Sequence, residues 1–130
     1  MTRKMAREEA FILIFEKAFN SDSVEEILKL AEEVRELEAD EYLVNVFTGV
    51  YANIDEIDGI ISSKALGWKI ERISKTALSL LRLAIYEIIF LDDIPVSVSI
   101  NEAVELCKKY ATKEDSAFIN GILSSIAKER

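Results

Sequence analysis

The sequence contains no histidine, and its 130 residues include only one cysteine, one proline and four glycines. The absence of histidine excludes Ser-His-Asp triads, histidine metal ligands and the most common general base of enzymes. A single cysteine, Cys107, can form neither an internal disulfide bond nor a thiolate zinc cluster. The sequence also has no glycine-rich loop of the GxGxxG or Walker type. We therefore expect no enzyme activity, no cofactor and no bound metal.

Signals for export or membrane insertion are missing as well. The amino terminus is basic, but no apolar signal core with a small-residue cleavage site follows it. The most apolar stretch, residues 77–91, is interrupted by Arg82 and Glu87 and is too short to span a bilayer. We expect a cytoplasmic chain with no membrane partner, which agrees with a single free thiol.

What the chain does contain is typical of a folded helical domain. Half of its residues (50%) are apolar and nearly a third (31%) are charged. The apolar residues recur at helical spacing in almost every segment. This pattern predicts an all-α fold, with about seven helices in two small packed bundles that form one domain over residues 1–130. Residues 75–91 are apolar nearly all round, so we expect them to form a central helix that both bundles share.

Turn and capping signals predict where the helices begin and end. Ser99 with Glu102 matches a capping box at the start of a helix, although Ser97 is an alternative cap. Gly49 and Gly59 indicate close helix contacts or a bend inside one long helical pattern. The expected ranges are about 3–19, 24–37, 40–66, a short turn at 68–73, then 75–91, a helix from Ser97 or Ser99 to Tyr110, and a last helix capped by Thr112.

The charge of the chain is −8 and is unevenly distributed. A negative net charge argues against general affinity for nucleic acids, because phosphate binding needs a positive field. Residues 16–58 carry thirteen acidic and three basic side chains, whereas residues 62–82 carry five basic and one acidic. Two interpretations stay open at this point: a positive patch on a negative body, or a mosaic of solvated helix faces.

Two charged residues, Arg82 and Glu87, lie inside the most apolar predicted helix. Buried charges need partners, so we interpret them as structural ion pairs rather than as a functional site. Asn101 and Glu102 are candidate partners. We expect Tyr86 and Glu87, together with Asn101 and Glu102, to act as buried polar connectors between this helix and the one that follows.

Several short motifs, in a fixed order along the chain, resemble the NusB family of bacterial transcription antitermination factors. A basic opening with Ala-Arg-Glu begins the chain, an Ile-Asn-Glu-Ala segment lies near the middle of the second half, and a Phe-x-Asn-Gly-x-Leu segment closes it. Together they cover nearly the whole chain. The matching segments are 3–10, 57–58 with 68–73, 80–88, 94–95 with 100–106, and 118–123.

This resemblance implies a fold and a function. The fold would be all-α, with two helical bundles. Family members bind a single-stranded boxA RNA element together with ribosomal protein S10, which doubles as the factor NusE. The complex joins RNA polymerase and other Nus factors, and it suppresses termination during ribosomal RNA transcription. The resemblance places the S10 surface on the carboxy-terminal bundle, so the exposed side of residues 69–94 is a candidate.

Five residues are candidate RNA contacts. Arg3, Lys4 and Arg7 fall on one edge of the first predicted helix, where they could bind phosphate groups of RNA. The resemblance implies that Lys64 lies near RNA. Phe118 begins the last helix and could stack on an unpaired base, although core packing is the more common fate of such a residue.

Three alternatives stay open. The chain could be a purely protein-binding helical adaptor whose basic amino terminus is incidental. It could be a metal-dependent enzyme that uses the acidic helices. It could also form a homodimer that buries the first helix and hides the RNA surface.

Overall fold

The computed structural model describes residues 1–129, and this part of the chain contains seven α-helices, one short 3₁₀ helix and no strand. The predicted all-α fold is therefore confirmed. None of the described helices is long and apolar enough to cross a membrane. The helices are α1 (Arg3–Lys17), α2 (Val24–Val34), α3 (Glu41–Ala52), α4 (Ile54–Lys64), the 3₁₀ helix η1 (Ile70–Arg72), α5 (Lys75–Phe90), α6 (Val96–Tyr110) and α7 (Lys113–Ala127).

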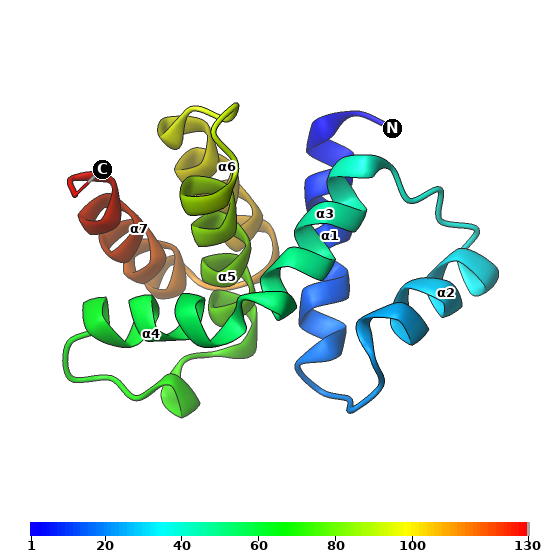
Figure 1. The fold of residues 1–130 in the computed structure, drawn as a ribbon. Coiled ribbons are helices and arrows are strands. Elements are labelled where there is room, and N and C mark those ends of the chain that lie inside the picture. The colour runs from blue at the N-terminus through cyan, green and yellow to red at the C-terminus, as the bar shows by residue number, and fades with distance from the viewer. Residues whose placement is uncertain (130) are drawn as a thin grey trace.

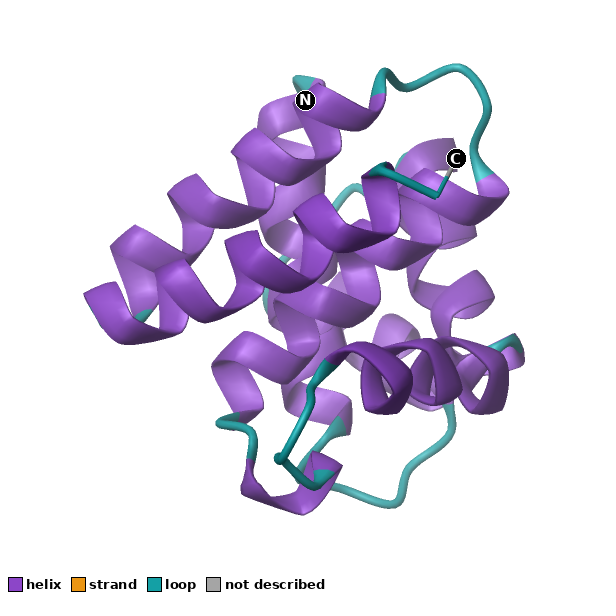
Figure 2. Cartoon of the chain, turned by 90° about the vertical axis from the view of Figure 1, so that its left-hand side faces the viewer, coloured by secondary structure: helices purple, strands orange, loops and turns teal. Residues whose placement is uncertain are grey.

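Helix α5 lies at the centre of the molecule, as its sequence predicts. It contacts α1 and α3 on one side and α4, α6 and α7 on the other. Figure 1 shows α1, α2 and α3 grouped on one side of the chain, with α4, α6 and α7 on the other. From Ala77 to Ile88 every residue of α5 except Arg82 is buried. The two bundles thus share one apolar helix. Figure 2, turned by 90°, shows helices joined by loops and no strand among the described residues.

The prediction of one long helix over residues 40–66 is wrong, because this segment forms the two helices α3 and α4. Asn53 has φ −120° and ψ 25°, which ends α3 and begins α4. Its side-chain amide donates to the carbonyl of Gly49 at 2.8 Å, so it satisfies a carbonyl at the end of α3. Gly49 serves a close contact rather than a bend, because a Cβ atom there would overlap the ring of Tyr86. The Tyr86 hydroxyl donates to Asn45 of α3, so the prediction that Tyr86 connects α5 to the next helix is wrong.

The predicted capping box at Ser99 and Glu102 is also wrong. Helix α6 begins at Val96, directly after Pro95, and has no side-chain cap. The backbone N–H groups of Val98 and Ser99 donate to the carbonyl of Pro95, so the first turn forms before Ser99 is reached. Ser99 is instead buried, and its hydroxyl points into the interior.

Candidate nucleic-acid interface

The amino-terminal edge, defined here as Arg3 and Lys4 at the start of α1, presents two exposed cations. Thr2 caps this helix, since its hydroxyl accepts from the backbone N–H of Met5 at 3.1 Å. The guanidinium carbon of Arg3 lies 4.3 Å from the centre of the Tyr42 ring. The ammonium of Lys4 lies 3.2 Å from a carboxylate oxygen of Glu102, and the Lys4 side chain is 73% exposed. Each cation is therefore oriented by one neighbour while it stays accessible to a ligand.

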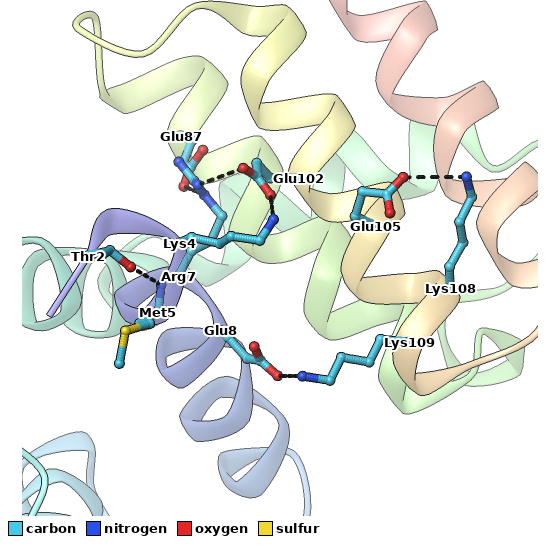
Figure 3. Close-up of polar contacts among 10 residues, drawn as sticks. All are labelled: Thr2, Lys4, Met5, Arg7, Glu8, Glu87, Glu102, Glu105, Lys108 and Lys109. Carbon is cyan, nitrogen blue, oxygen red and sulfur yellow. Dashed lines mark hydrogen bonds and ion pairs between the residues drawn. The ribbon is translucent and has the colours of Figure 1, made fainter.

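Arg7 does not lie on the exposed edge with Arg3 and Lys4. It is 4% exposed, and its Nε donates to Glu87 Oε2 at 2.8 Å (Figure 3). Burial alone would lower the pKa of Arg7, but the hydrogen bond and charge of Glu87 outweigh it and raise that pKa, so the guanidinium stays charged. Helical spacing does put Arg7 one turn after Arg3, yet that side of α1 faces α5. A phosphate contact by Arg7 stays a prediction, and its burial disfavours it.

Glu87 is the centre of a buried polar cluster that joins four helices. It is 1% exposed. Its Oε2 accepts from Arg7 of α1 and from the hydroxyl of Tyr42 of α3, and its Oε1 accepts from the Ser99 hydroxyl of α6 at 2.7 Å. Burial raises the pKa of Tyr42, and the neighbouring Glu87 carboxylate adds to the rise, so Tyr42 stays a hydrogen-bond donor. The sequence indicated that Glu87 needs partners, but it pointed to Asn101 and Glu102 rather than to these three residues.

Arg82, the other charged residue of α5, pairs within the carboxy-terminal bundle. Its Nε and one terminal nitrogen each lie 2.9 Å from an oxygen of Asp58 on α4. This bidentate contact agrees with the structural ion pair interpreted from the sequence. Elsewhere the acidic residues do not converge: among residues 1–129 no group of three or more potential ligands is placed to hold a metal ion.

Lys64 lies at the end of α4, where its ammonium pairs with Glu129 beyond the end of α7. The Lys64 side chain is only 18% exposed. Helix α4 runs away from α1 in Figure 1, so its last residue is not part of the amino-terminal edge. The assignment of Lys64 to RNA binding stays a prediction.

Phe118 lies on α7 beside Trp68, with the two ring centres 6.1 Å apart and the rings tilted by 66°. It packs partly against the core, and it also lines a pocket of about 230 Å³. Trp68 is 56% exposed. The two predicted roles of Phe118, core packing and ligand contact, are thus compatible. We call this site the aromatic pocket; its lining is Trp68, Arg72, Ile73, Ser74, Glu114, Asp115 and Phe118.

Trp68 and Arg72 were not among the candidate residues, although the sequence carries a signal for Trp68. A tryptophan directly after Gly67 and beside Lys69 lies in a basic turn, where a large aromatic side chain has little core to enter. Gly67 has φ +81°, a left-handed conformation that turns the chain after α4 and leaves Trp68 outside the bundle. An exposed aromatic next to cations is typical of a surface that binds nucleic acids.

The fold and these two regions define an all-helical binding protein with a cationic edge at α1 and a separate aromatic pocket between η1 and α7. The chain belongs to the NusB family, whose family model matches residues 4–128. The resemblance seen in its sequence motifs is therefore confirmed.

Curated relatives and solved structures cover nearly the whole chain. Transcription antitermination protein NusB of Natranaerobius thermophilus is 46% identical over 134 residues, which covers 99% of this chain and 96% of that protein. The same-named protein of Ruminiclostridium cellulolyticum is 45% identical, with coverage of 98% and 90%. The T. maritima NusB structure has a TM-score of 0.88 and 34% identity, covering 100% of this chain and 93% of that chain. A structure of antitermination factors NusB and NusE in complex with dsRNA also gives 0.88, at 30% identity and coverage of 98% and 97%.

Proposed function

We propose that this chain is a transcription antitermination factor that binds boxA-type single-stranded RNA together with ribosomal protein S10 (NusE). It would act in the cytoplasm as a binding factor rather than an enzyme, within a complex that includes RNA polymerase and other Nus factors and promotes processive ribosomal RNA transcription. One observation carries the proposal. The chain matches, over 98% of its length and with a TM-score of 0.88, a structure of antitermination factors NusB and NusE in complex with dsRNA.

The two regions of the site suit two parts of an RNA strand. Arg3 and Lys4 fit phosphates, because exposed cations on one helix edge contact the backbone without reading sequence. Trp68 and Phe118 fit the face of an unpaired base, which stacks on aromatic side chains. Two phosphate contacts give only a shallow salt dependence, and the net charge of −8 opposes RNA elsewhere. S10 is therefore needed for tight binding.

A titration with fluorescently labelled RNA tests the proposal. A boxA-type single strand, a scrambled strand and a duplex are each titrated with this chain alone and with the chain plus S10, and anisotropy is recorded. We expect weak binding of the boxA strand by the chain alone and much tighter, sequence-dependent binding with S10. Equal affinity for the boxA and scrambled strands in the presence of S10 would contradict the proposal.

The net charge of −8 favours one alternative, a purely protein-binding adaptor. In that case S10 binds this chain, but adding the boxA strand changes neither the affinity for S10 nor the anisotropy of the RNA. Light scattering at the titration concentrations supplies the control for self-association, because a homodimer that covers α1 would hide the amino-terminal edge.

A further inference from the structure

We infer that Glu87 is a positioning residue for RNA binding, which holds Arg3 and Lys4 in place through Tyr42 and Arg7 without contacting RNA itself. The inference rests on the proposed function, since it concerns how that site is built. It also gives Arg7 a role other than the phosphate contact predicted from the sequence.

Glu87 has the geometry of a fixed support. It is 1% exposed, and both of its carboxylate oxygens are occupied: Oε1 by Ser99, and Oε2 by Arg7 and Tyr42. No solvent competes with these hydrogen bonds, so each donor has one favourable position. The donors come from α6, α1 and α3, and the cluster therefore fixes the start of α1 relative to both bundles.

One branch of the cluster leads to Lys4. Arg7 donates to Glu87 through Nε, and its terminal nitrogen lies 3.8 Å from one oxygen of Glu102. The other oxygen of Glu102 lies 3.2 Å from the ammonium of Lys4. Figure 3 shows the Arg7 side chain directed at Glu87, with Glu102 between Arg7 and Lys4. A single carboxylate thus connects the buried guanidinium to the exposed ammonium.

The other branch leads to Arg3. The Tyr42 hydroxyl donates to Glu87, which fixes the orientation of the Tyr42 ring. The guanidinium of Arg3 lies on that ring, 4.3 Å from its centre, where a cation is attracted by the ring face. Tyr42 is 8% exposed, so its packed surroundings also limit movement of the ring on which Arg3 lies.

The first turn of α1 needs this support. It has no acidic residue, and Arg3 and Lys4 place positive charge where the helix dipole is also positive. Thr2 supplies one cap, and the first turns of a helix otherwise fray. Tertiary contacts from Arg7 and Tyr42 therefore decide whether the two cations are displayed together.

The test compares Glu87→Gln with Ile88→Val, a buried neighbour on α5 whose trimming leaves the cluster intact. RNA affinity is measured with S10 across a range of salt concentrations. Glu87→Gln makes the chain one charge less negative, so simple electrostatics predicts tighter binding. If the two phosphate contacts are lost, we instead expect roughly tenfold weaker binding at low salt and a salt slope shallower by about 1.4, with Ile88→Val unchanged.

A combined variant shows whether Glu87 acts through the edge. Adding Glu87→Gln to Arg3→Ala/Lys4→Ala should weaken binding no further, because the residues it positions are already gone. An additional loss in the combined variant, or unchanged or tighter binding by Glu87→Gln alone, would overturn the inference. Tighter binding would mean that Glu87 withholds Arg7 from RNA rather than supporting its neighbours.

Two further measurements test the inference if Glu87→Gln does not fold or does not bind RNA. Tyr42→Phe retains the ring and removes only the hydroxyl, so it can replace Glu87→Gln in the RNA titration. We expect a smaller loss of RNA affinity than the loss expected for Glu87→Gln. Hydrogen exchange of residues 3–7, without RNA, should be faster in Glu87→Gln than in Ile88→Val. Faster exchange in Glu87→Gln, combined with no RNA binding by the unmodified chain, would refute the proposed function but not the positioning role of Glu87. Equal exchange in the two variants would refute that positioning role.

Discussion

The amino-terminal edge and the aromatic pocket differ in what they offer a ligand. The edge is built from charge: the exposed Lys4 pairs with Glu102, and the exposed Arg3 lies on the ring of Tyr42. The pocket is built from rings, and the acidic residues Glu114 and Asp115 lie in its lining. Phosphate contacts weaken as salt rises, whereas stacking depends little on salt. An RNA strand that contacts both regions would therefore be held by two forces that respond to different conditions.

The largest expected effect comes from removing the stacking surface. Phe118→Leu keeps an apolar side chain against the core but loses the ring, and we expect RNA binding to weaken by roughly 1–3 kcal/mol. Titrations at two salt concentrations measure the loss, which should be the same at both. Phe118→Tyr retains a ring and serves as the control. A loss that shrinks as salt rises would show that the pocket works by charge and would erase the contrast with the edge.

Neutralising the edge should have the next largest effect and the opposite salt behaviour. Arg3→Ala/Lys4→Ala removes two phosphate contacts, so we expect binding about tenfold weaker at low salt and a salt slope shallower by about 1.4. Lys17→Ala/Lys29→Ala makes the same change in net charge within the acidic part of the chain and should leave the slope unchanged. If both pairs act alike, only net charge matters, and the edge is not a specific site.

Ser74→Ala tests whether the aromatic pocket depends on the helix that borders it. The Ser74 hydroxyl caps α5 by accepting from the backbone N–H of Ala77 at 3.1 Å, and it lies 3.3 Å from Asp115. We expect a loss of about 1 kcal/mol in the free energy of unfolding, which urea denaturation measures. Ser74→Asp, which can also cap, should recover part of it. RNA affinity that falls with this stability would mean that the cap, and not only the rings, shapes the pocket.

The smallest effect is expected from Lys64→Ala. Lys64 forms an ion pair with Glu129 and lies away from the amino-terminal edge, so we expect RNA affinity to change by about 0.5 kcal/mol or less. The companion variant Glu129→Ala, which frees the lysine, should also have little effect. A loss as large as that from Arg3→Ala/Lys4→Ala would extend the cationic surface to α4 and replace two separate regions with one continuous one.

The sequence predicts the fold well because the fold depends on helical periodicity and on one apolar segment. The range expected for α5 differs from the observed helix by one residue at its end, since Ser74 and the break before Pro95 mark both limits. The division between α3 and α4 could not be predicted in the same way. It depends on a backbone conformation at Asn53, a residue that is also compatible with a helix interior.

The candidate site was predicted only in part, for a physical reason. Residues one turn apart share a side of a helix, so Arg3 and Arg7 look equivalent in the sequence. Which side faces α5 depends on residues such as Glu87 and Tyr42 that are far along the chain. The aromatic pocket likewise joins Trp68 to Phe118, and only the packed fold brings them together.

The buried contact between Arg7 and Glu87 has a consequence for how the protein is made. The two residues are separated by 80 positions in the chain. Chains emerge from the ribosome with the amino terminus first, so Arg7 is exposed long before its partner is synthesised. Helix α5, which supplies the core for α1 and α3, emerges late as well. The first residues to leave the ribosome are therefore among the last to reach their final positions, and the nascent chain completes its amino-terminal edge only after Glu87 has emerged.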